Sequence, residues 1–578
     1  MKKITLIISA LLLITACGPK VEPIERQENP NEFPPGPGPG TGGDLPGDEG
    51  DGGNTGDEGG SPMEPNIPTS DDPDYYWEAN SWTREVKVEF KGSSASVTSS
   101  DKAILFNVVG AYVTIDMYTN DVSKTVVRVS GSSSDGSLKI YGQNKFKLSL
   151  EGVDLCSKKG AALNDQCHKR VFIHLKEGSD NRFTDASVYS GDPFYLDKDG
   201  FTKAEEDCKG CLFSEGNVIF SGSGSLSVKG SCSMKNGISV DGAVYTRPDF
   251  KGSISSAVSS AGGKAIKSNK EVVLTSGAVN LSATGSRIYD SAESDYKNPA
   301  GIKSDSTVHI IGGSLTISCT GTKGKGIKAE DRIAIDGGVL KLTTTGSEGE
   351  GIESKIKVAG AITVNGGDNY INTRDDGINA AGSIVFNGGR TYVWASGNDG
   401  LDSNYGQSNS IVFNGGFIAA FSAASPEMGI DADNNSRITF KGGTVFTSGG
   451  NQGGGSSSGA SCTQPTVWAQ GIKLTTGYFT VTDSENKVIM SVYVPRALNG
   501  SYSFISSPEF KANGTYNYGM TSTAPAESSE NWETWYYCGG TAKVTDGTFT
   551  AGTGYSSIGT GGSTGGGSRP PGGGWPRP

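Results

Sequence analysis

The sequence predicts an all-β protein, a right-handed three-faced parallel β-helix with a β-rich C-terminal cap, from three observations. The 578-residue chain holds 86 glycines and only 34% hydrophobic residues, which suits no large helical core. A motif beginning with Gly-Ile recurs about every 25 residues along the middle of the chain. Each repeat contains three short alternating segments separated by turn residues, without helical periodicity. This pattern is typical of a solenoid in which each repeat forms one coil.

The chain opens with a segment typical of an export signal. Lys2 and Lys3 precede the apolar run 4–14, which is too short to span a bilayer as a mature helix. The sequence "ITAC" that follows resembles the lipobox of bacterial lipoproteins. This resemblance implies a signal peptide over residues 1–16 and a lipid on Cys17. The protein would then be a cell-envelope lipoprotein, anchored in the periplasm or at the outer surface; the alternative is a signal peptide with an incidental cysteine.

Two segments of the chain carry too little apolar surface to fold. Residues 17–74 are rich in Pro, Gly, Asp and Glu, and residues 556–578 are rich in Gly and Pro. Such compositions do not offset the entropy lost on ordering. We expect a disordered acidic linker before the folded part and a disordered tail after it.

The repeats place the β-helix at residues 84–447. Each repeat has a strand around Gly-Ile, a second strand such as 384–386, a Gly-Gly turn, and a third strand such as 340–342. A left-handed hexapeptide helix needs a stricter six-residue rhythm, and a propeller blade needs about 40 to 50 residues. The repeats begin at Gly210, Gly237, Ala265, Gly301, Gly326, Gly351, Gly377, Gly400 and Gly429.

The repeat fades after about residue 448, and alternating segments return within residues 462–555. A β-helix leaves an open apolar end with unpaired strand edges, which must be covered. We expect residues 462–555 to form a β-rich cap at that end.

Several stretches resemble a known family. They are "GCLFSEGNVIFSGSGSLSVKG", the series of "GI(K/D)" and "NGG" repeats, and "ISSPEFKANGTYNY". They look like the carbohydrate-binding β-helix proteins of bacterial surfaces, which have the shape of pectate lyases. The resemblance covers roughly residues 87–518. It implies binding of acidic polysaccharide and of calcium, which the repeat alone does not show.

Repeat alignment predicts which side chains stack on the outer surface. Equivalent positions of successive coils should lie about 4.8 Å apart, as neighbouring strands do. The Ile or Leu after each glycine faces the core, so the next residue points outward. The outward row is expected to be Lys267, Lys303, Lys328, Glu353, Asn379, Asp402 and Asp431. The residues preceding each glycine, at the turn, are Lys325, Glu350, Asp376, Asp399 and Met428.

The acidic part of these rows predicts a calcium site. We expect two stacked pairs of carboxylates, Asp376 over Asp399 and Asp402 over Asp431. Each pair would repel by about 1 kcal/mol in water and by roughly 3 to 4 kcal/mol at an effective dielectric constant near 20. Ca²⁺ takes six to eight oxygen ligands in flexible geometry, so it suits such a cluster. Possible supplementary ligands are Glu350, Glu353, Asn404 and Asp433. The alternative is that Asp and Asn are good turn formers beside glycine.

The basic part of the rows predicts contacts with sugar carboxylates through Lys303, Lys325 and Lys328. Lysines on a solvated sheet also prevent aggregation, and this interpretation remains open. Tyr392 and Trp394 alternate on one strand and so point to the same side. They are either outward platforms for sugar rings or core residues.

The predicted function is calcium-assisted binding of an acidic, polygalacturonate-like polysaccharide by a monomer. A net charge of −12 disfavours nucleic acid as a partner. One alternative is a pectate-lyase-like enzyme with Arg374 or Lys328 as the base beside calcium. Another is a structural adhesin rod, whose charges would be scattered instead of segregated into rows.

An exported protein permits disulfides. Cys156 and Cys167 flank a polar loop, and Cys208 and Cys211 form a CxxC. We expect both pairs to staple loops, with a zinc or redox role as the alternative for the CxxC.

Two further cysteines border the expected cap, and one lies within the repeats. We expect Cys462 and Cys538 to be bonded to each other. Cys319 alternates with apolar residues on its strand, so we expect it to be a buried free thiol.

Overall fold

The structure is a computed structural model that describes residues 71–190, 206–450 and 459–559. These residues belong to the second of the chain's two units, Gly59–Pro578. The expected signal peptide 1–16, Cys17, and most of the expected linker 17–74 and tail 556–578 lie outside the described residues. Within the described ranges, no helix has the length and apolarity needed to cross a membrane.

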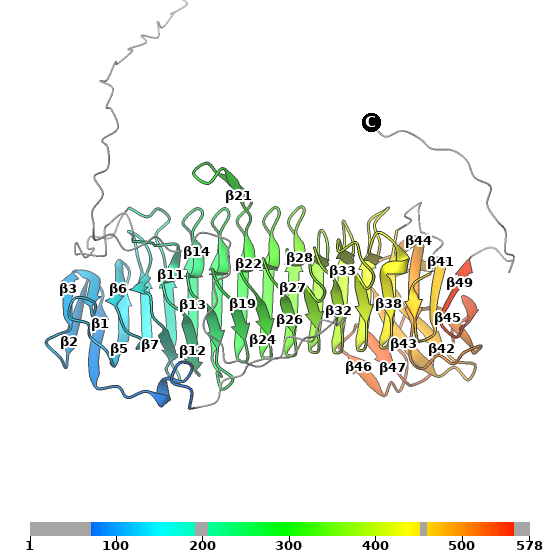
Figure 1. Cartoon of the computed structure of the whole chain (residues 1–578), viewed down its shortest axis with the longest axis horizontal. Helices are drawn as coiled ribbons and strands as arrows, with labels where there is room; N and C mark the ends of the chain where they lie inside the picture. Colours follow the sequence, from blue (N-terminus) through cyan, green and yellow to red (C-terminus); the bar gives the residue numbers. More distant parts are fainter. Residues whose placement is uncertain (1–70, 191–205, 451–458, 560–578) are drawn as a thin grey trace, which may run out of the picture. The chain divides into compact units, whose positions relative to one another are not determined.

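The described residues are almost entirely β-structure, which confirms the all-β prediction. Two short 3-10 helices, η1 (Trp77–Ala79) and η2 (Asn435–Arg437), are the helical segments that the structure describes. Most strands belong to a 28-stranded sheet or a 13-stranded sheet, and most pairings are parallel. The strands stack side by side in sequence order (Figure 1).

The larger sheet contains two ladders, which we name ladder 1 and ladder 2. Ladder 1 joins the middle strands of the repeats: β9 (Val171–Leu175), β12 (Val218–Gly222), β15 (Val244–Thr246), β18 (Val272–Leu274), β23 (Val308–Ile310), β26 (Ile333–Ile335), β29 (Ile362–Val364), β32 (Ile384–Phe386), β35 (Ile411–Phe413), β38 (Ile438–Phe440) and β40 (Ser461–Cys462). Ladder 2 joins the third strands: β10 (Asp180–Thr184), β13 (Ser225–Gly230), β16 (Ser253–Val258), β19 (Ala278–Ala283), β24 (Ser314–Cys319), β27 (Val339–Thr344), β30 (Asp368–Thr373), β33 (Arg390–Ala395), β36 (Phe417–Ser422) and β39 (Thr444–Gly449).

The 13-stranded sheet joins the Gly-Ile strands, and we name it the Gly-Ile sheet. It begins with an antiparallel pair and is parallel thereafter. Its strands are β3 (Leu105–Val109), β4 (Ala111–Asp116), β6 (Gly136–Gly142), β8 (Leu163–Cys167), β11 (Gly210–Ser214), β14 (Asn236–Val240), β17 (Lys264–Ser268), β22 (Ala300–Ser304), β25 (Lys325–Ala329), β28 (Glu350–Ser354), β31 (Ile378–Ala380), β34 (Leu401–Ser403) and β37 (Ile430–Asp431). Each central repeat therefore supplies one strand to each of three parallel ladders, as expected.

Three of the first strands are longer than those of the repeats. They are β1 (Arg84–Lys91), β5 (Thr125–Ser133) and β7 (Phe146–Cys156), and β2 (Ser94–Ser99) pairs with β1. β7 pairs with β9 through its first half and with β10 through its second half. Ladders 1 and 2 are therefore continuous with each other at this end. A hairpin of β20 (Ile288–Asp290) and β21 (Asp295–Lys297) projects from the stack (Figure 1).

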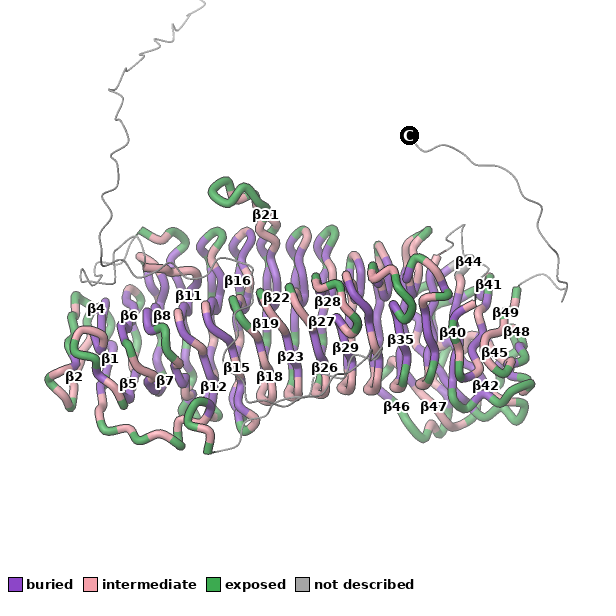
Figure 2. Tube along the Cα trace, viewed as in Figure 1, coloured by how far each residue is buried: buried purple, intermediate pink, exposed green. Residues whose placement is uncertain are grey.

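The core lies between the ladders and is built from aligned aliphatic residues. Ile302, Ile327, Ile352 and Ile378 pair in register along the Gly-Ile sheet, and each is fully buried. The glycine that precedes each isoleucine lies so close to atoms of the neighbouring strands that a side chain at its position would not fit. Burial follows the strands, and exposure follows the connecting turns (Figure 2).

The Gly-Gly turns between ladders 1 and 2 stack as closely as the strands. Gly338 has φ of +81°, and a Cβ there would lie 2.6 Å from the carbonyl oxygen of Gly313 in the preceding coil. Only glycine accepts both conditions without strain. The asparagines that precede these turns also stack, since Asn387 donates to Asn365 and Asn414 donates to Asn387, each at 2.7 Å.

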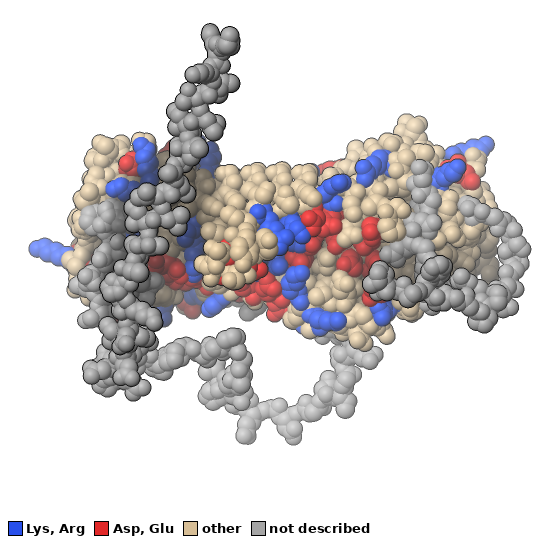
Figure 3. All heavy atoms as spheres, turned by 90° about the horizontal axis from the view of Figure 1, so that it is seen from above, with Lys and Arg blue, Asp and Glu red and all other residues tan. Residues whose placement is uncertain are grey.

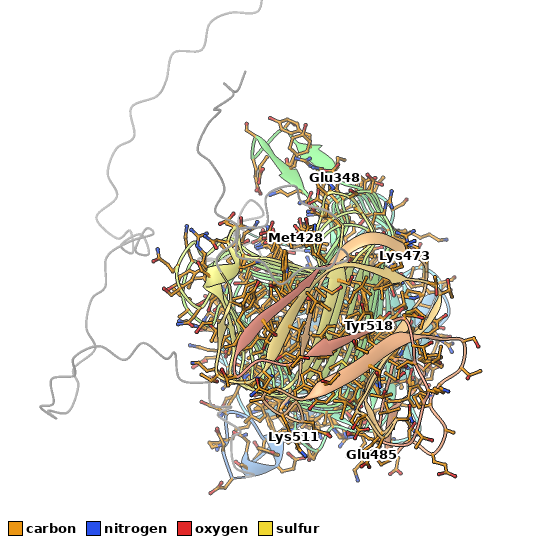
Figure 4. All side chains as sticks on the ribbon, turned by 90° about the vertical axis from the view of Figure 1, so that its right-hand side faces the viewer. Glu348, Met428, Lys473, Glu485, Lys511 and Tyr518 are labelled. Atoms are coloured by element: carbon orange, nitrogen blue, oxygen red, sulfur yellow. The ribbon has the colours of Figure 1, made fainter. Side chains whose placement is uncertain are left out.

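The C-terminal strands have two arrangements. β41 (Thr466–Leu474), β44 (Leu498–Ser506) and β49 (Tyr555–Gly559) extend the larger sheet, beginning with the antiparallel pairing of β44 with β39. A separate antiparallel sheet contains β42 (Gly477–Thr482), β43 (Val488–Val494), β45 (Thr515–Thr521), β46 (Glu530–Trp532), β47 (Tyr536–Cys538) and β48 (Gly547–Thr550), and we name it the C-terminal sheet. Figure 4 shows strands lying across this end of the stack, with Tyr518 of β45 facing the viewer.

Candidate functional site

The outward row has the register that the repeats predict. Lys267 pairs with Lys303, which pairs with Lys328, followed by Glu353, Asn379, Asp402 and Asp431 in successive strands. At the turn before the glycines, Lys325 pairs with Glu350. Basic and acidic side chains therefore adjoin each other midway along the Gly-Ile sheet. Figure 3 shows such neighbouring groups of opposite charge on the surface seen from above.

The three lysines expected to meet sugar carboxylates are already paired with carboxylates of the protein. Lys303 contacts Asp305 at 2.8 Å and also pairs with Glu330. Lys328 lies 3.4 Å from Glu353. Their ammonium groups are thus paired within the protein, and the predicted contacts with sugar carboxylates would have to replace or share these ion pairs.

Lys325 is the most buried of the three, with 9% of its side chain exposed. It pairs with Glu350 and lies 3.6 Å from Glu353. Glu353 is also paired with Lys328 and Lys355. Burial opposes the ionisation of Glu353, but the surrounding ammonium groups together hold its pKa below the usual range. Its charge is matched by three lysines, so Glu353 is a weaker candidate calcium ligand than the unpaired aspartates.

Glu350 differs from its neighbour Glu353. Burial and then the Glu353 charge raise the pKa of Glu350, although Lys325 pairs with it. Its Oε2 atom is buried and has no hydrogen-bond partner, as is also true of Oε2 of Glu353. Glu350 therefore presents an uncommitted oxygen at the boundary between the basic and acidic parts of the rows.

Asp376 and Asp399 fasten one coil to the next. Oδ1 of Asp376 accepts from the backbone N–H of Asp399 at 3.0 Å, and Oδ1 of Asp399 accepts from that of Met428 at 2.5 Å. Both residues are buried, with 4% of Asp376 and 6% of Asp399 exposed. This geometry supports the turn-forming interpretation for one oxygen of each residue. The second oxygen of Asp376 accepts from the Asn379 amide at 2.9 Å.

The acidic end of the rows has no positive charge to match it. Among the residues that the structure describes, Asp376, Asp399, Asp402 and Asp431 form no ion pair with Lys, Arg or His. Burial, followed by the Asp402 charge, raises the pKa of Asp376 to about 7. Burial also raises the pKa of Asp399 to about 8, and burial and then Asp431 raise that of Asp402 to about 7. A divalent cation that bound these carboxylates would displace their protons into the solvent.

Asn404 and Asp433 lie at the edge of this cluster. The Asn404 amide donates to Oδ2 of Asp402 at 2.8 Å, which leaves the Asn404 carbonyl oxygen available. Asp433 is paired with Arg437 at 2.7 Å, and its backbone N–H donates to Asp431. Its charge is therefore matched, and it is a weaker candidate ligand than Asn404.

The acids that the structure brings closest together are three that the sequence analysis missed, and no three of the predicted calcium ligands converge to the same degree among the described residues. Within the described ranges, Asp207, Glu215 and Asp241 place ligand oxygens within 4.8 Å of one another. Lys209 already pairs with two of them, Asp207 at 2.6 Å and Asp241 at 2.7 Å. The available signal was that Glu215 and Asp241 each follow the end of strands that pair in register, β11 and β14.

Tyr392 and Trp394 are not sugar platforms. Both side chains point away from the coil interior, but the C-terminal sheet covers them. Tyr392 is 0% exposed and Trp394 is 6% exposed. The Tyr392 hydroxyl donates to the carbonyl of Tyr493 at 3.0 Å, and its ring centroid lies 4.8 Å from that of Trp535. The outward residues of ladder 2 from β33 to β39 therefore form an internal packing surface, and the prediction of sugar contacts for Tyr392 and Trp394 is wrong.

The expected disulfides are not formed. All eight cysteines in the described ranges are free thiols, including Cys319, which is buried as expected. Cys156 ends a strand of the larger sheet, whereas Cys167 ends a strand of the Gly-Ile sheet. The other expected pairs are Cys208 with Cys211 and Cys462 with Cys538.

The environments of these cysteines explain why the pairs do not form. Cys211 is buried in the main core, whereas Cys208 lines a surface pocket. Cys462 packs on the main core, whereas Cys538 packs with the C-terminal sheet. The spacing of cysteines in sequence did not reveal these separate environments.

The bases expected for a lyase are also engaged. Lys328 is paired with Glu353, as described above. The Arg374 guanidinium donates to the Ser396 hydroxyl at 3.5 Å. Neither side chain is a free base beside the acidic cluster.

Comparison with known proteins identifies a family. The family model described as "Carbohydrate-binding domain-containing protein" matches residues 110–400, half of the chain. A solved structure, the polysaccharide lyase-like protein from C. thermocellum in a gadolinium derivative, is similar at 21% identity. That similarity covers 46% of this chain and 94% of the other, with a TM-score of 0.35. No curated protein matches the chain.

Proposed function

The chain belongs to the family of carbohydrate-binding domain-containing proteins, and from this premise we propose that it binds an acidic polysaccharide with the assistance of calcium. The observation that carries the proposal is the unmatched acidic cluster on the Gly-Ile sheet. Asp376, Asp399, Asp402 and Asp431 occupy successive coils without a basic partner in the described part of the chain. Such an arrangement is costly unless protons or a cation compensate it.

The donor atoms suit a hard cation by their chemistry, although no three acids of this cluster place ligand oxygens within 4.8 Å of one another in the described structure, so binding would draw their side chains together. Asp399 and Asp402 each keep an oxygen outside the hydrogen bonds described above, and Asp431 keeps one besides that bound to Asp433. Glu350 adds a buried oxygen without a partner, and Asn404 adds a carbonyl oxygen. Calcium bound there would neutralise the carboxylates and leave positions for oxygens of a sugar carboxylate. Asp376 holds the turn with both of its oxygens and would act mainly through its charge.

We propose that the three ladders form a right-handed three-faced parallel β-helix. Nearly all connections between parallel strands of one sheet are right-handed, because a twisted strand packs back onto its sheet in that way. The repeats supply one strand per ladder in constant order, which suits a continuous coil. The C-terminal strands would serve as its cap.

We further propose attachment to the cell envelope through a lipid on Cys17, at the outer surface or in the periplasm, with the protein acting as a monomer. The motivation is the lipobox-like sequence at the end of the signal segment. Replacing Cys17 by alanine should move the protein from the membrane fraction to the soluble fraction. Unchanged fractionation would refute the anchor.

Two alternatives remain distinguishable. A polysaccharide lyase would form unsaturated uronates, which absorb in the ultraviolet, when it is incubated with polygalacturonate and calcium. A structural rod would bind no glycan. A glycan array probed with and without a chelator tests the binding proposal against both, because binding to acidic glycans should fall in the chelator without formation of unsaturated products.

A further inference from the structure

A pocket lies on the outer side of the Gly-Ile sheet near its first strands, away from the acidic cluster, and we name it the N-terminal pocket. Its volume is about 300 Å³, at the lower end for sites that bind small molecules. Residues from β4, β6 and β8 form part of its wall, including Tyr112, Ser137 and Asn164. The described lining residues all fall within the segment 110–400 that matches the carbohydrate-binding family.

Two lysines in the pocket wall have no carboxylate partner. Lys159 lies over the ring of Tyr112, with its nitrogen 4.6 Å from the ring centroid, and Lys235 lies over Tyr189 at 5.5 Å. Neither forms an ion pair in the part of the chain that the structure describes. The aromatic rings hold these ammonium groups in place without neutralising them. This differs from the outward row, where each lysine is paired.

The acidic groups of the pocket are already engaged. Glu206 pairs with the buried Lys139 and accepts from the Tyr141 hydroxyl at 2.6 Å. Asp207 pairs with Lys209. The pocket therefore carries two unmatched positive charges in a chain whose net charge is −12. A small anion bound in the pocket would supply the negative charge that these two lysines lack.

Polar groups beside the lysines suit a sugar better than a simple anion. Ser137 and Asn164 are each 5% exposed and line the pocket. Oδ1 of Asn164 accepts from the Gln166 amide at 2.6 Å, which fixes the Asn164 amide in one orientation. A hydroxyl and an oriented amide can bind sugar hydroxyls, and tyrosine rings can contact the apolar side of a pyranose.

We propose that the N-terminal pocket binds one anionic sugar unit, a pyranose that carries a carboxylate, without calcium. The inference rests on the proposed binding of acidic polysaccharide and adds a second subsite to it. Lys159 and Lys235 bind the carboxylate, and Ser137 and Asn164 bind hydroxyls. The acidic cluster and the pocket lie on the same sheet, so a long chain can occupy both.

The test measures binding of trigalacturonate and of its methyl ester to the full mature protein in EDTA, which silences the calcium site. The free acid should bind. The ester should have an affinity at least about tenfold lower, because it lacks the charge. This comparison on the wild type needs no variant. Equal binding of acid and ester, or no binding of the acid, overturns the proposal.

Variants locate the site. Lys159→Met combined with Lys235→Met should weaken binding of the acid in EDTA by about tenfold or more, with an unchanged melting temperature. Lys251→Met changes an exposed lysine outside the pocket and should bind as the wild type does. Wild-type affinity in the double variant overturns the assignment.

Failure here and failure of the proposed function have different signatures. Loss of the calcium-dependent increment in Asp402→Asn, together with absent binding in EDTA, would retain the calcium site and reject the pocket. Binding in EDTA that calcium does not strengthen would retain the pocket and reject the calcium site.

Discussion

Asp402 stacks on Asp431 in parallel register on neighbouring coils, and neither carboxylate has a basic partner among the described residues. A few coils earlier, Lys325 and Lys328 are fully paired with Glu350 and Glu353. The acids of the same rows are therefore paired with lysines at one end and have no basic partner at the other among the described residues. The proposed calcium site follows from this difference.

The stability of the protein without calcium should fall as pH rises from about 4 to about 8. Burial and neighbouring carboxylates raise the pKa values of Asp376 and Asp402 to about 7 and of Asp399 to about 8, above the ordinary value of 3.8. The folded state therefore holds protons that the unfolded state releases, so the free energy of unfolding decreases with pH through this window. Thermal unfolding in EDTA at several pH values measures it.

Calcium should reverse this loss, most strongly at high pH, because it binds the ionised carboxylates. Other buried acids, such as Asp165, also have raised pKa values, so the wild type alone does not identify the cluster. Asp402→Asn should show a weaker pH dependence and a smaller increase in melting temperature with calcium. Identical profiles for the variant and the wild type would argue against the cluster.

Lys325→Met should destabilise the fold by about 3 to 5 kcal/mol, because it leaves Glu350 buried without its partner. Lys323→Met breaks a more exposed pair with Glu348 and should cost less than about 1 kcal/mol. Adding Glu350→Gln to Lys325→Met should recover much of the loss. Urea unfolding measures all three, and a Lys325→Met variant as stable as Lys323→Met would contradict the buried pairing.

Tyr392→Ala should destabilise the contact with the C-terminal sheet by about 3 to 5 kcal/mol through the cavity it leaves. Tyr392→Phe removes only the hydrogen bond to Tyr493 and should cost about 1 kcal/mol. Tyr289→Ala on the exposed hairpin should have little effect. Limited proteolysis should cut the C-terminal sheet faster in Tyr392→Ala alone; equal cutting in all three variants would place Tyr392 outside the interface.

Thiol titration of the unfolded, unreduced protein should detect all eight cysteines of the described residues. The reason is the separation of Cys462 and Cys538 into different hydrophobic clusters. Peptide mass mapping without reductant provides the check. A peptide containing both cysteines joined would restore the disulfide that the sequence suggested.

The sequence was sufficient for the all-β class, the repeat, and the register of the outward row. Register follows from a period that places each Gly-Ile over the next, and Ile327 over Ile352 follows directly from the alignment. The burial of Cys319 followed from alternation along its strand.

The partner of Lys303 did not follow from the same alignment. Lys303 reaches Glu330, which lies outside its row, whereas Lys325 and Lys328 pair with Glu350 and Glu353, the residues in register with them on the next strand. Alignment of the repeats predicts the positions of the Cβ atoms. A long lysine side chain can still reach charged groups in several rows, so its partner is not determined by the alignment. The burial of Tyr392 depends on the C-terminal sheet, a contact over about a hundred residues that periodicity does not contain.

Calorimetric titration with polygalacturonate, with and without calcium, on the wild type, Asp402→Asn and the exposed control Glu485→Gln tests the central claim most directly. The account predicts that calcium strengthens binding to the wild type and the control, and that Asp402→Asn loses about tenfold or more of this calcium-dependent increment. An increment of equal size in Asp402→Asn, or binding to the wild type that calcium does not change, would contradict it.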